Sequence, residues 1–177
     1  WFRDLIDRLV QESVEYLSLQ IEAGAQAVQI FDSWAGELPG RAGDVFVVDP
    51  LCRMVAALKK RHPKVPVILF GRGFGVRQPE LAARTGANAI GLESELPMGW
   101  AAENVGQETA LQGNLDPVAL QCDARTVRAE TRAVLEAIPM GRHVFNLGHG
   151  IRQGTDPGII TEVVTAVRDW DKGVRGE

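Results

Sequence analysis

The chain is poor in cysteine and has no long apolar run, and both shortages narrow what it can be. Its two cysteines, Cys52 and Cys122, lie far apart and form neither a Cys-x-x-Cys pair nor a Cys/His cluster. We therefore expect reduced, structural thiols in a cytoplasmic protein. The longest apolar stretches, such as Val65 to Phe70, are too short to cross a bilayer, and the first residues lack the layout of a signal peptide.

Charge of one sign does not dominate either. The 177 residues carry 19 Lys and Arg against 23 Asp and Glu, a net charge of −4. This balance gives no electrostatic reason to expect nucleic acid or a membrane as a partner, so an acidic ligand must be bound by locally clustered basic residues. With 45% hydrophobic and 24% charged residues the composition is typical of a globular protein. The length predicts that residues 1–177 form a single domain.

Helical and strand-like segments alternate along the chain. Apolar spacing, glycines at helix ends and prolines at helix starts define them. The expected helices cover about residues 5–23, 50–61, 79–84, 97–105, 123–137 and 157–170. The expected strands cover about residues 25–31, 65–70, 87–92, 109–112 and 143–147, and a glycine-rich loop is expected at 36–43.

One phrase occurs twice in this alternation. Ala23–Val28 (AGAQAV) and Thr85–Ile90 (TGANAI) each place a helix-ending glycine before an apolar strand. Regular alternation predicts an α/β fold with parallel strands, in which ligands meet the C-terminal strand ends. The repeat favours a barrel, although a doubly wound sheet would also fit. Five strands cannot close a (β/α)8 barrel, so the sequence predicts either an open sheet or part of a larger protein.

The most informative strand end lies near the C-terminus, in the segment His143–Ile151 (HVFNLGHGI). An apolar strand ends there in His149, which lies between two glycines that permit an open turn. An imidazole donates hydrogen bonds and can be charged near neutral pH, which suits a ligand with carboxylates. The alternative is a histidine that only caps the turn.

Three segments resemble one enzyme family. They are Gln29–Gly36 (QIFDSWAG), Leu111–Pro117 (LQGNLDP) and Phe145–Gly150 (FNLGHG), and their order and spacing are similar to those of uroporphyrinogen decarboxylases. The resemblance extends from about residue 5 to about residue 168 and implies a (β/α)8 TIM barrel with a deep cleft at the C-terminal strand ends. It also implies a homodimeric carboxy-lyase of porphyrin and haem biosynthesis. Its substrate would be the tetrapyrrole polycarboxylate uroporphyrinogen III, whose four acetate side chains become methyl groups in coproporphyrinogen III without metal or cofactor.

The family's N-terminal signatures have no counterpart in the sequence. There is no RxAGRY segment to supply carboxylate-binding arginines, and neither the pyrrole-binding aspartate nor the later tyrosine of the family is matched. Tyr16, the single tyrosine, lies on the first expected helix. The chain therefore resembles the C-terminal five β/α units of the barrel, so the barrel is incomplete in this chain. We expect the parent protein to be the enzyme and the chain alone to be inactive.

Three residues are the candidates for substrate binding. By the resemblance, His149 matches a strand-end histidine that faces the substrate, so it is the candidate catalytic residue and also a ligand for a carboxylate. Ser33 matches a serine that contacts a substrate carboxylate; the alternative is a turn serine bonded to its own backbone. Arg72 lies between glycines at a strand end, where a guanidinium can bind a carboxylate bidentately. The alternative is a solvated loop arginine.

The other polar residues at the strand ends have lesser expected roles. We expect Asp32 to be structural, and Asn114 and Asp116 to lie in a turn where their side chains fix the backbone. Arg77 and Arg152 are weaker candidates for binding carboxylates at the same rim.

Two other functions compete with the decarboxylase. A zinc-dependent methyltransferase of the same superfamily would need a His-x-Cys pair and a further cysteine as zinc ligands, and the sequence contains no His-x-Cys. We therefore expect no metal. A half-barrel that binds porphyrin or a protein partner without catalysis is the second alternative.

Overall fold

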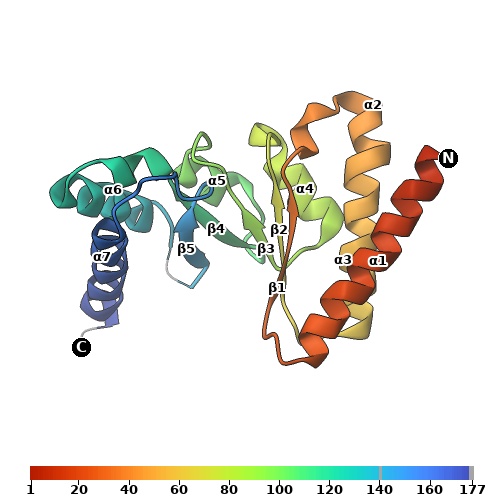
Figure 1. Cartoon of the computed structure of the whole chain (residues 1–177), viewed down its shortest axis with the longest axis horizontal. Coiled ribbons are helices and arrows are strands. Elements are labelled where there is room, and N and C mark those ends of the chain that lie inside the picture. Colours follow the sequence, from red (N-terminus) through yellow and green to blue (C-terminus); the bar gives the residue numbers. More distant parts are fainter. Residues whose placement is uncertain (140, 176–177) are drawn as a thin grey trace. The chain divides into compact units, whose positions relative to one another are not determined.

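The computed structural model describes residues 1–139 and 141–175 of the chain. It is an α/β fold in which five strands alternate with helices, and every strand pair described is parallel (Figure 1). The chain divides into two compact units. The first comprises residues 1–91 and 104–110, and the second comprises residues 92–103 and those from 111 onward.

The first unit contains three strands in chain order, with β1 paired to β2 and β2 paired to β3. Its elements are α1 (Phe2–Glu22), β1 (Val28–Asp32), a 3-10 turn (Ala35–Glu37), α2 (Gly40–Gly43), a π-helical segment (Asp44–Val48), α3 (Asp49–Arg61), β2 (Val67–Gly71), a second 3-10 turn (Gly75–Arg77), α4 (Gln78–Thr85) and β3 (Ala89–Gly91). The glycine-rich loop expected at 36–43 was only partly right, because helix begins at Gly40 and continues into α3. Pro39 precedes it in an extended conformation, as a residue before a helix can be.

The core of the first unit lies between its helices and strands. Helix α1 packs lengthwise on α3 (Figure 1). The buried side chains are aliphatic. On the two helices they follow a helical spacing, at Val10, Val14, Leu17, Val55 and Leu58. On strands β1 and β2 they alternate, at Val28, Ile30, Val67 and Leu69. Each fully buried leucine or valine contributes about 1.5–3 kcal/mol relative to an exposed one.

The outer face of α1 carries a second apolar stripe that is exposed to solvent. Its residues recur at intervals of three, four and seven, the spacing of one helix face: Phe2, Leu5, Leu9, Tyr16 and Leu19. Leu9 is 51% exposed and Tyr16 is 66% exposed. An apolar stripe of this kind is typical of a contact surface rather than of an ordinary solvated helix face.

The second unit pairs β4 with β5 in parallel, from Leu111 opposite His143 to Leu115 opposite Leu147. Its elements are α5 (Met98–Asn104), β4 (Ala110–Leu115), a 3-10 helix (Pro117–Gln121), α6 (Ala124–Glu136), β5 (His143–Leu147) and α7 (Pro157–Arg175). Helices α6 and α7 pack on each other (Figure 1). The core beneath them contains Leu115, Leu120, Val127 and Val163.

Three local features of the second unit can be compared with the sequence. The expected strand at 143–147 is confirmed residue by residue. The expected end of the preceding strand was wrong, because β4 continues past Gln112 to Leu115 and so includes Asn114. Asp123 starts α6 as an N-cap, with its carboxylate accepting the Thr126 N–H at 2.8 Å.

Over the residues that the structure describes, no helix is long and apolar enough to span a membrane.

Candidate functional site

The loops that follow β1 and β2 are tied to each other by their backbones. The Arg72 N–H donates to the Asp32 carbonyl at 2.9 Å, and the Gly36 N–H donates to the Arg72 carbonyl at 2.8 Å. The carboxylate of Asp32 accepts the Trp34 N–H at 3.0 Å and so closes the turn that contains Ser33. Asp32 is therefore a turn-forming residue, as expected from the sequence, and Ser33 and Arg72 lie on neighbouring, hydrogen-bonded loops.

Two glycines allow these loops to approach so closely. A Cβ added to Gly36 would overlap the backbone carbonyl of Gly73, and one added to Gly73 would lie 3.0 Å from the Cα of Gly36. Gly73 also has a φ of +80°, which disfavours any side chain. The contact is backbone against backbone, so neither loop can shift far without the other.

A buried amide holds the second loop from behind. The side chain of Gln78, at the start of α4, is fully buried and donates from Nε2 to the carbonyl of Gly71 at 3.1 Å. Gly71 is the residue before Arg72, so this bond fixes the point at which the Arg72 loop leaves the strand. This bond could not be predicted from the sequence, because a glutamine at a helix start is common and carries no pattern of its own.

Ser33 and Arg72 are both exposed on these fixed loops. Within residues 1–139 and 141–175 the Arg72 guanidinium forms no ion pair. A guanidinium and a hydroxyl on two hydrogen-bonded loops are groups that can bind a carboxylate, with the arginine supplying charge and the serine a further hydrogen bond.

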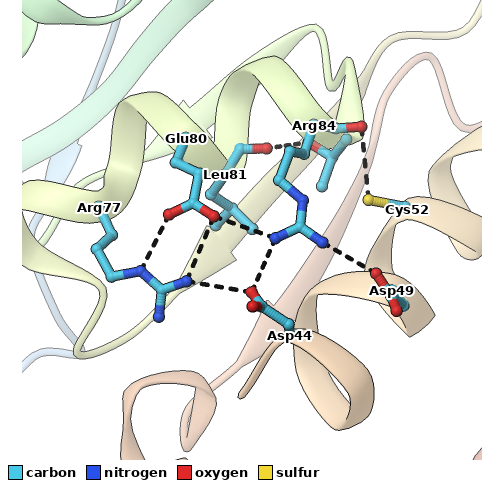
Figure 2. Close-up of polar contacts among 8 residues, drawn as sticks. Asp44, Asp49, Cys52, Arg77, Glu80, Leu81 and Arg84 are labelled. Atoms are coloured by element: carbon cyan, nitrogen blue, oxygen red, sulfur yellow. Dashed lines mark hydrogen bonds and ion pairs between the residues drawn. The ribbon is translucent and has the colours of Figure 1, made fainter. Parts of the chain in front are cut away.

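Arg77, a weaker candidate for binding carboxylates, is used for structure instead. Its guanidinium bonds to the Glu80 carboxylate at 3.1 Å and to Asp44 at 3.3 Å (Figure 2). The Arg77 side chain also lies over the Phe74 ring at 5.2 Å, so it is held on the protein surface. The structure thus gives Arg77 two carboxylate partners within the protein, and its proposed place at the ligand-binding rim stays a prediction.

Arg84 is the centre of the same ionic cluster (Figure 2). Its guanidinium contacts Asp44 at 2.8 Å, Asp49 at 3.0 Å and Glu80 at 3.1 Å, linking α4 to the helix that begins at Gly40. The hydrogen bond from Arg84 lowers the pKa of Asp44 below its usual range. Cys52 also belongs here, since its thiol donates to the Arg84 carbonyl at 3.5 Å and burial raises its pKa, as suits an unreactive thiol.

In the second unit, the loop after β5 rests on the ends of two other segments. The Gly148 N–H donates to the Leu115 carbonyl at 2.9 Å. A Cβ on Gly148 would overlap Oγ and the backbone nitrogen of Ser94, so only glycine fits between the β5 end and the segment after β3. His149 follows directly and is exposed, with an exposed Gly150 after it. The strand-end placement expected for His149 is confirmed.

Asn114 ties the segment after β3 to β4. Its side chain is 6% exposed, and Nδ2 donates to the Glu93 carbonyl at 2.7 Å and to the Leu96 carbonyl at 2.6 Å. Asp116 accepts the Val118 N–H at 2.8 Å and caps the following 3-10 turn. Both side chains fix backbone, as the sequence predicted, but Asn114 does so from within the strand.

The other histidine near these strands has a different environment. His143, at the start of β5, is partly buried, and its Nε2 lies 2.6 Å from the Gly113 carbonyl. Burial lowers the pKa of His143, although the hydrogen bond to Gly113 opposes that shift. His143 is thus a neutral structural group, whereas His149 is open to ligands.

Metal-binding chemistry has no obvious place among the described residues. Over residues 1–139 and 141–175, no cluster of three His, Cys, Asp or Glu side chains could hold a metal ion. The two cysteines are both free thiols: Cys52 is half-buried on α3, and Cys122 is exposed after the 3-10 helix.

Comparison with known proteins supplies the family. The uroporphyrinogen decarboxylase (URO-D) family model matches residues 1–170. The uroporphyrinogen decarboxylase of Paracoccus denitrificans (strain Pd 1222) is 46% identical over 167 residues, which are 94% of this chain and 49% of that protein. The uroporphyrinogen decarboxylase of Rhizorhabdus wittichii is 43% identical over 167 residues, 94% of this chain and 48% of that protein. The chain thus spans about half the length of the curated relatives it matches.

A solved structure resembles the chain in fold alone. A 2,3-dimethylmalate lyase, a member of the PEP mutase/isocitrate lyase superfamily, matches with a TM-score of 0.55 over 86% of this chain and 57% of that protein. Its sequence is 19% identical, so the likeness concerns the arrangement of helices and strands and not the chemistry.

Proposed function

The chain belongs to the uroporphyrinogen decarboxylase family, and from that premise we propose that it forms the C-terminal five β/α units of a uroporphyrinogen decarboxylase. The complete barrel would be of the (β/α)8 type. Parallel strands alternating with helices support this proposal, as do polar loops at the C-terminal strand ends, where enzymes of that architecture bind substrate.

The proposed reaction is the cofactor-free conversion of uroporphyrinogen III to coproporphyrinogen III. Each acetate side chain loses CO2 and gains one proton, which leaves a methyl group. Protonation of an electron-rich pyrrole carbon creates a cation that accepts the electrons of the breaking C–C bond. The protein then has to orient a polycarboxylate, deliver a proton and stabilise a cation, and positioning supplies much of the rate.

The observation that carries the proposal is the presence of free polar groups at the strand ends. Arg72 and Ser33 are exposed on the rigid rim of the first unit, and His149 is exposed at the end of β5. We assign carboxylate binding to all three residues and proton delivery to His149 as the catalytic residue. By the same resemblance the enzyme would be a cytoplasmic homodimer that requires no metal.

A chimaeric enzyme tests the proposal. This chain replaces the 167 matched residues of the Paracoccus denitrificans relative, to which it is 46% identical. The chimaera is expected to convert uroporphyrinogen III to coproporphyrinogen III under anaerobic conditions, measured by chromatography of the oxidised porphyrins. A folded chimaera that binds uroporphyrin but releases no product with fewer carboxylates would contradict the proposal. The unmodified Paracoccus protein is the positive control.

A further inference from the structure

We propose that Asn114 is a positioning residue for His149, acting through the turn at residues 93–96 and through Gly148. The consequence for catalysis rests on the proposed function, because that function makes His149 the catalytic residue. The mechanical link itself rests on the contacts within the second unit and does not depend on the reaction.

The first link is the amide of Asn114. Both bonds from its single Nδ2 go to carbonyls of one turn, to Glu93 at 2.7 Å and to Leu96 at 2.6 Å. The Asn114 side chain is buried. Water therefore cannot easily replace these two hydrogen bonds when the amide is removed, and their loss is costly. The turn also contains a Leu96 N–H bond to the Glu93 carbonyl at 3.3 Å, so the residues between are held as one piece.

The second link is the contact between this turn and the β5 end. Ser94 lies inside the turn, and the Cα of Gly148 is so close to it that an added Cβ would overlap Oγ and the backbone nitrogen of Ser94. On its other side, Gly148 donates its N–H to the carbonyl of Leu115, the residue after Asn114. Two consecutive residues of β4 therefore fix Gly148. Asn114 acts through its side chain and the turn, and Leu115 acts through its backbone.

His149 inherits its position from Gly148. The residue is exposed, and an added Cβ at the next residue, Gly150, would meet no atom within 4 Å. The loop is tied to another segment at Thr155, six residues after His149, where Gln121 Nε2 donates to the Thr155 hydroxyl at 2.7 Å. A shift of Ser94 would consequently move the His149 backbone, and displacements of about 1 Å at a catalytic group cost roughly a hundredfold in rate.

Nuclear magnetic resonance of the 177-residue chain tests the mechanical link. Asn114→Asp keeps the shape of the side chain and removes the donors. The backbone amide signals of Ser94, Gly148 and His149 are expected to shift together in this variant. Asn146→Asp is the matched control, because Asn146 lies opposite Asn114 on β5 and is exposed, and its Oδ1 accepts the Leu147 N–H at 2.8 Å. Unchanged signals for Gly148 and His149 in Asn114→Asp would overturn the inference.

A second pair of variants keeps the test sharp if Asn114→Asp does not fold. Gly148→Ala forces a methyl group against Ser94, whereas Gly150→Ala places the same methyl group in open space on the other side of His149. We expect Gly148→Ala to displace the amide signals of both Ser94 and His149, and Gly150→Ala to leave the Ser94 signal in place. Equal effects on Ser94 would show that the turn does not support the His149 loop.

A double-mutant cycle in the chimaera then measures the effect on catalysis. Asn114→Asp is expected to lower kcat for decarboxylation by about tenfold to a hundredfold with a smaller change in KM. In the His149→Ala background, Asn114→Asp should lower kcat by less than about twofold, because the imidazole that it would displace is already absent. Additive losses would overturn the positioning role. If His149→Ala leaves kcat unchanged while the amide signals still move together, the proposed function fails and the mechanical link stands.

Discussion

The two units hold their candidate ligand-binding residues in different ways. In the first, the loops carrying Ser33 and Arg72 are bound backbone to backbone, with Gly36 against Gly73. In the second, one backbone bond from Gly148 to Leu115 holds the His149 loop, and the side chain of Asn114 adds a second tie that acts through a turn. Backbone ties survive most side-chain changes, whereas a side-chain tie is lost with a single substitution. We therefore expect the loop structure of the first rim, formed by the loops after β1 and β2, to tolerate substitution of its exposed residues. The second rim, formed by the loop after β5, should be sensitive to substitution of Asn114, a residue that no ligand contacts.

Removing the imidazole should have the largest effect on activity and tests whether the second rim is the catalytic one. His149→Ala in the chimaera is expected to lower decarboxylation by about a hundredfold, the scale of a lost proton donor. Intermediates with five to seven carboxylates should accumulate. Chromatography of the products over time provides the measurement, and unchanged turnover at each step would remove His149 from the mechanism.

Inserting a methyl group at Gly36 tests the backbone tie of the first rim. Gly36→Ala must push the Gly73 carbonyl away, so the free energy of unfolding should fall by about 1–3 kcal/mol. Gly106→Ala is the matched control, because an added Cβ there has no neighbour within 4 Å. Urea unfolding followed by circular dichroism measures both variants. Equal stabilities would mean that the two loops can separate freely.

Removing one hydroxyl from the first rim should have a smaller effect than removing the imidazole from the second. For Ser33→Ala we expect a loss of about 1.5 kcal/mol in transition-state binding, the lower end for a hydrogen bond to a charged group, or roughly tenfold in kcat/KM. Arg72→Lys is a useful companion, since it keeps the charge and removes the planar fork. A Ser33→Ala enzyme with unchanged kcat/KM would assign this serine to its turn alone.

The partly buried His143 predicts a pH dependence of stability. Because burial lowers the pKa of His143, the unfolded chain takes up a proton at higher pH than the folded chain does. His143 therefore favours the folded state above its unfolded pKa of about 6.5 and disfavours it as the pH falls below that value. Thermal melts between pH 7.5 and pH 5 should show a steeper loss for the natural chain than for His143→Gln. Parallel curves would contradict this assignment.

The smallest expected effect belongs to the ionic cluster behind the first rim. Its side chains are exposed by a third or more, so solvent screens them. Arg84→Gln should lower the melting temperature slightly, and the difference from the natural chain should shrink as salt is added. Because the hydrogen bond from Arg84 lowers the pKa of Asp44, this contribution is present above the unfolded pKa of about 3.9 and is lost as the pH falls further. A salt-independent difference would point to packing instead.

Much of this arrangement followed from the sequence, and the rest did not for physical reasons. The β5 boundaries, the helix expected from about residue 123 and the exposed position of His149 depend on local patterns that a sequence displays. The partners of Arg77, by contrast, include Asp44, thirty-three positions earlier, and no local rule indicates that pair. The amide contacts of Asn114 are long-range in the same sense, so the sequence could suggest that Asn114 fixes backbone without indicating which backbone. The contact of Gln78 with Gly71 spans only seven positions, but no sequence pattern marks it.

The π-helical segment Asp44–Val48 has one consequence for how this chain can change. Residues of an α-helix advance by about 100° each, so two carboxylates five residues apart would diverge by about 140°. The wider turn of a π-helix, with bonds from each carbonyl to the fifth residue on, brings such residues back to one side. Asp44 and Asp49 are five apart, the Asp49 N–H bonds to the Asp44 carbonyl, and Arg84 reaches both carboxylates. The segment thus ties a length to a helix type: with the carboxylates five positions apart, only the π-helical turn lets Arg84 reach both. A regular α-helix would present both to Arg84 only after the deletion of one residue, because a spacing of four leaves them about 40° apart.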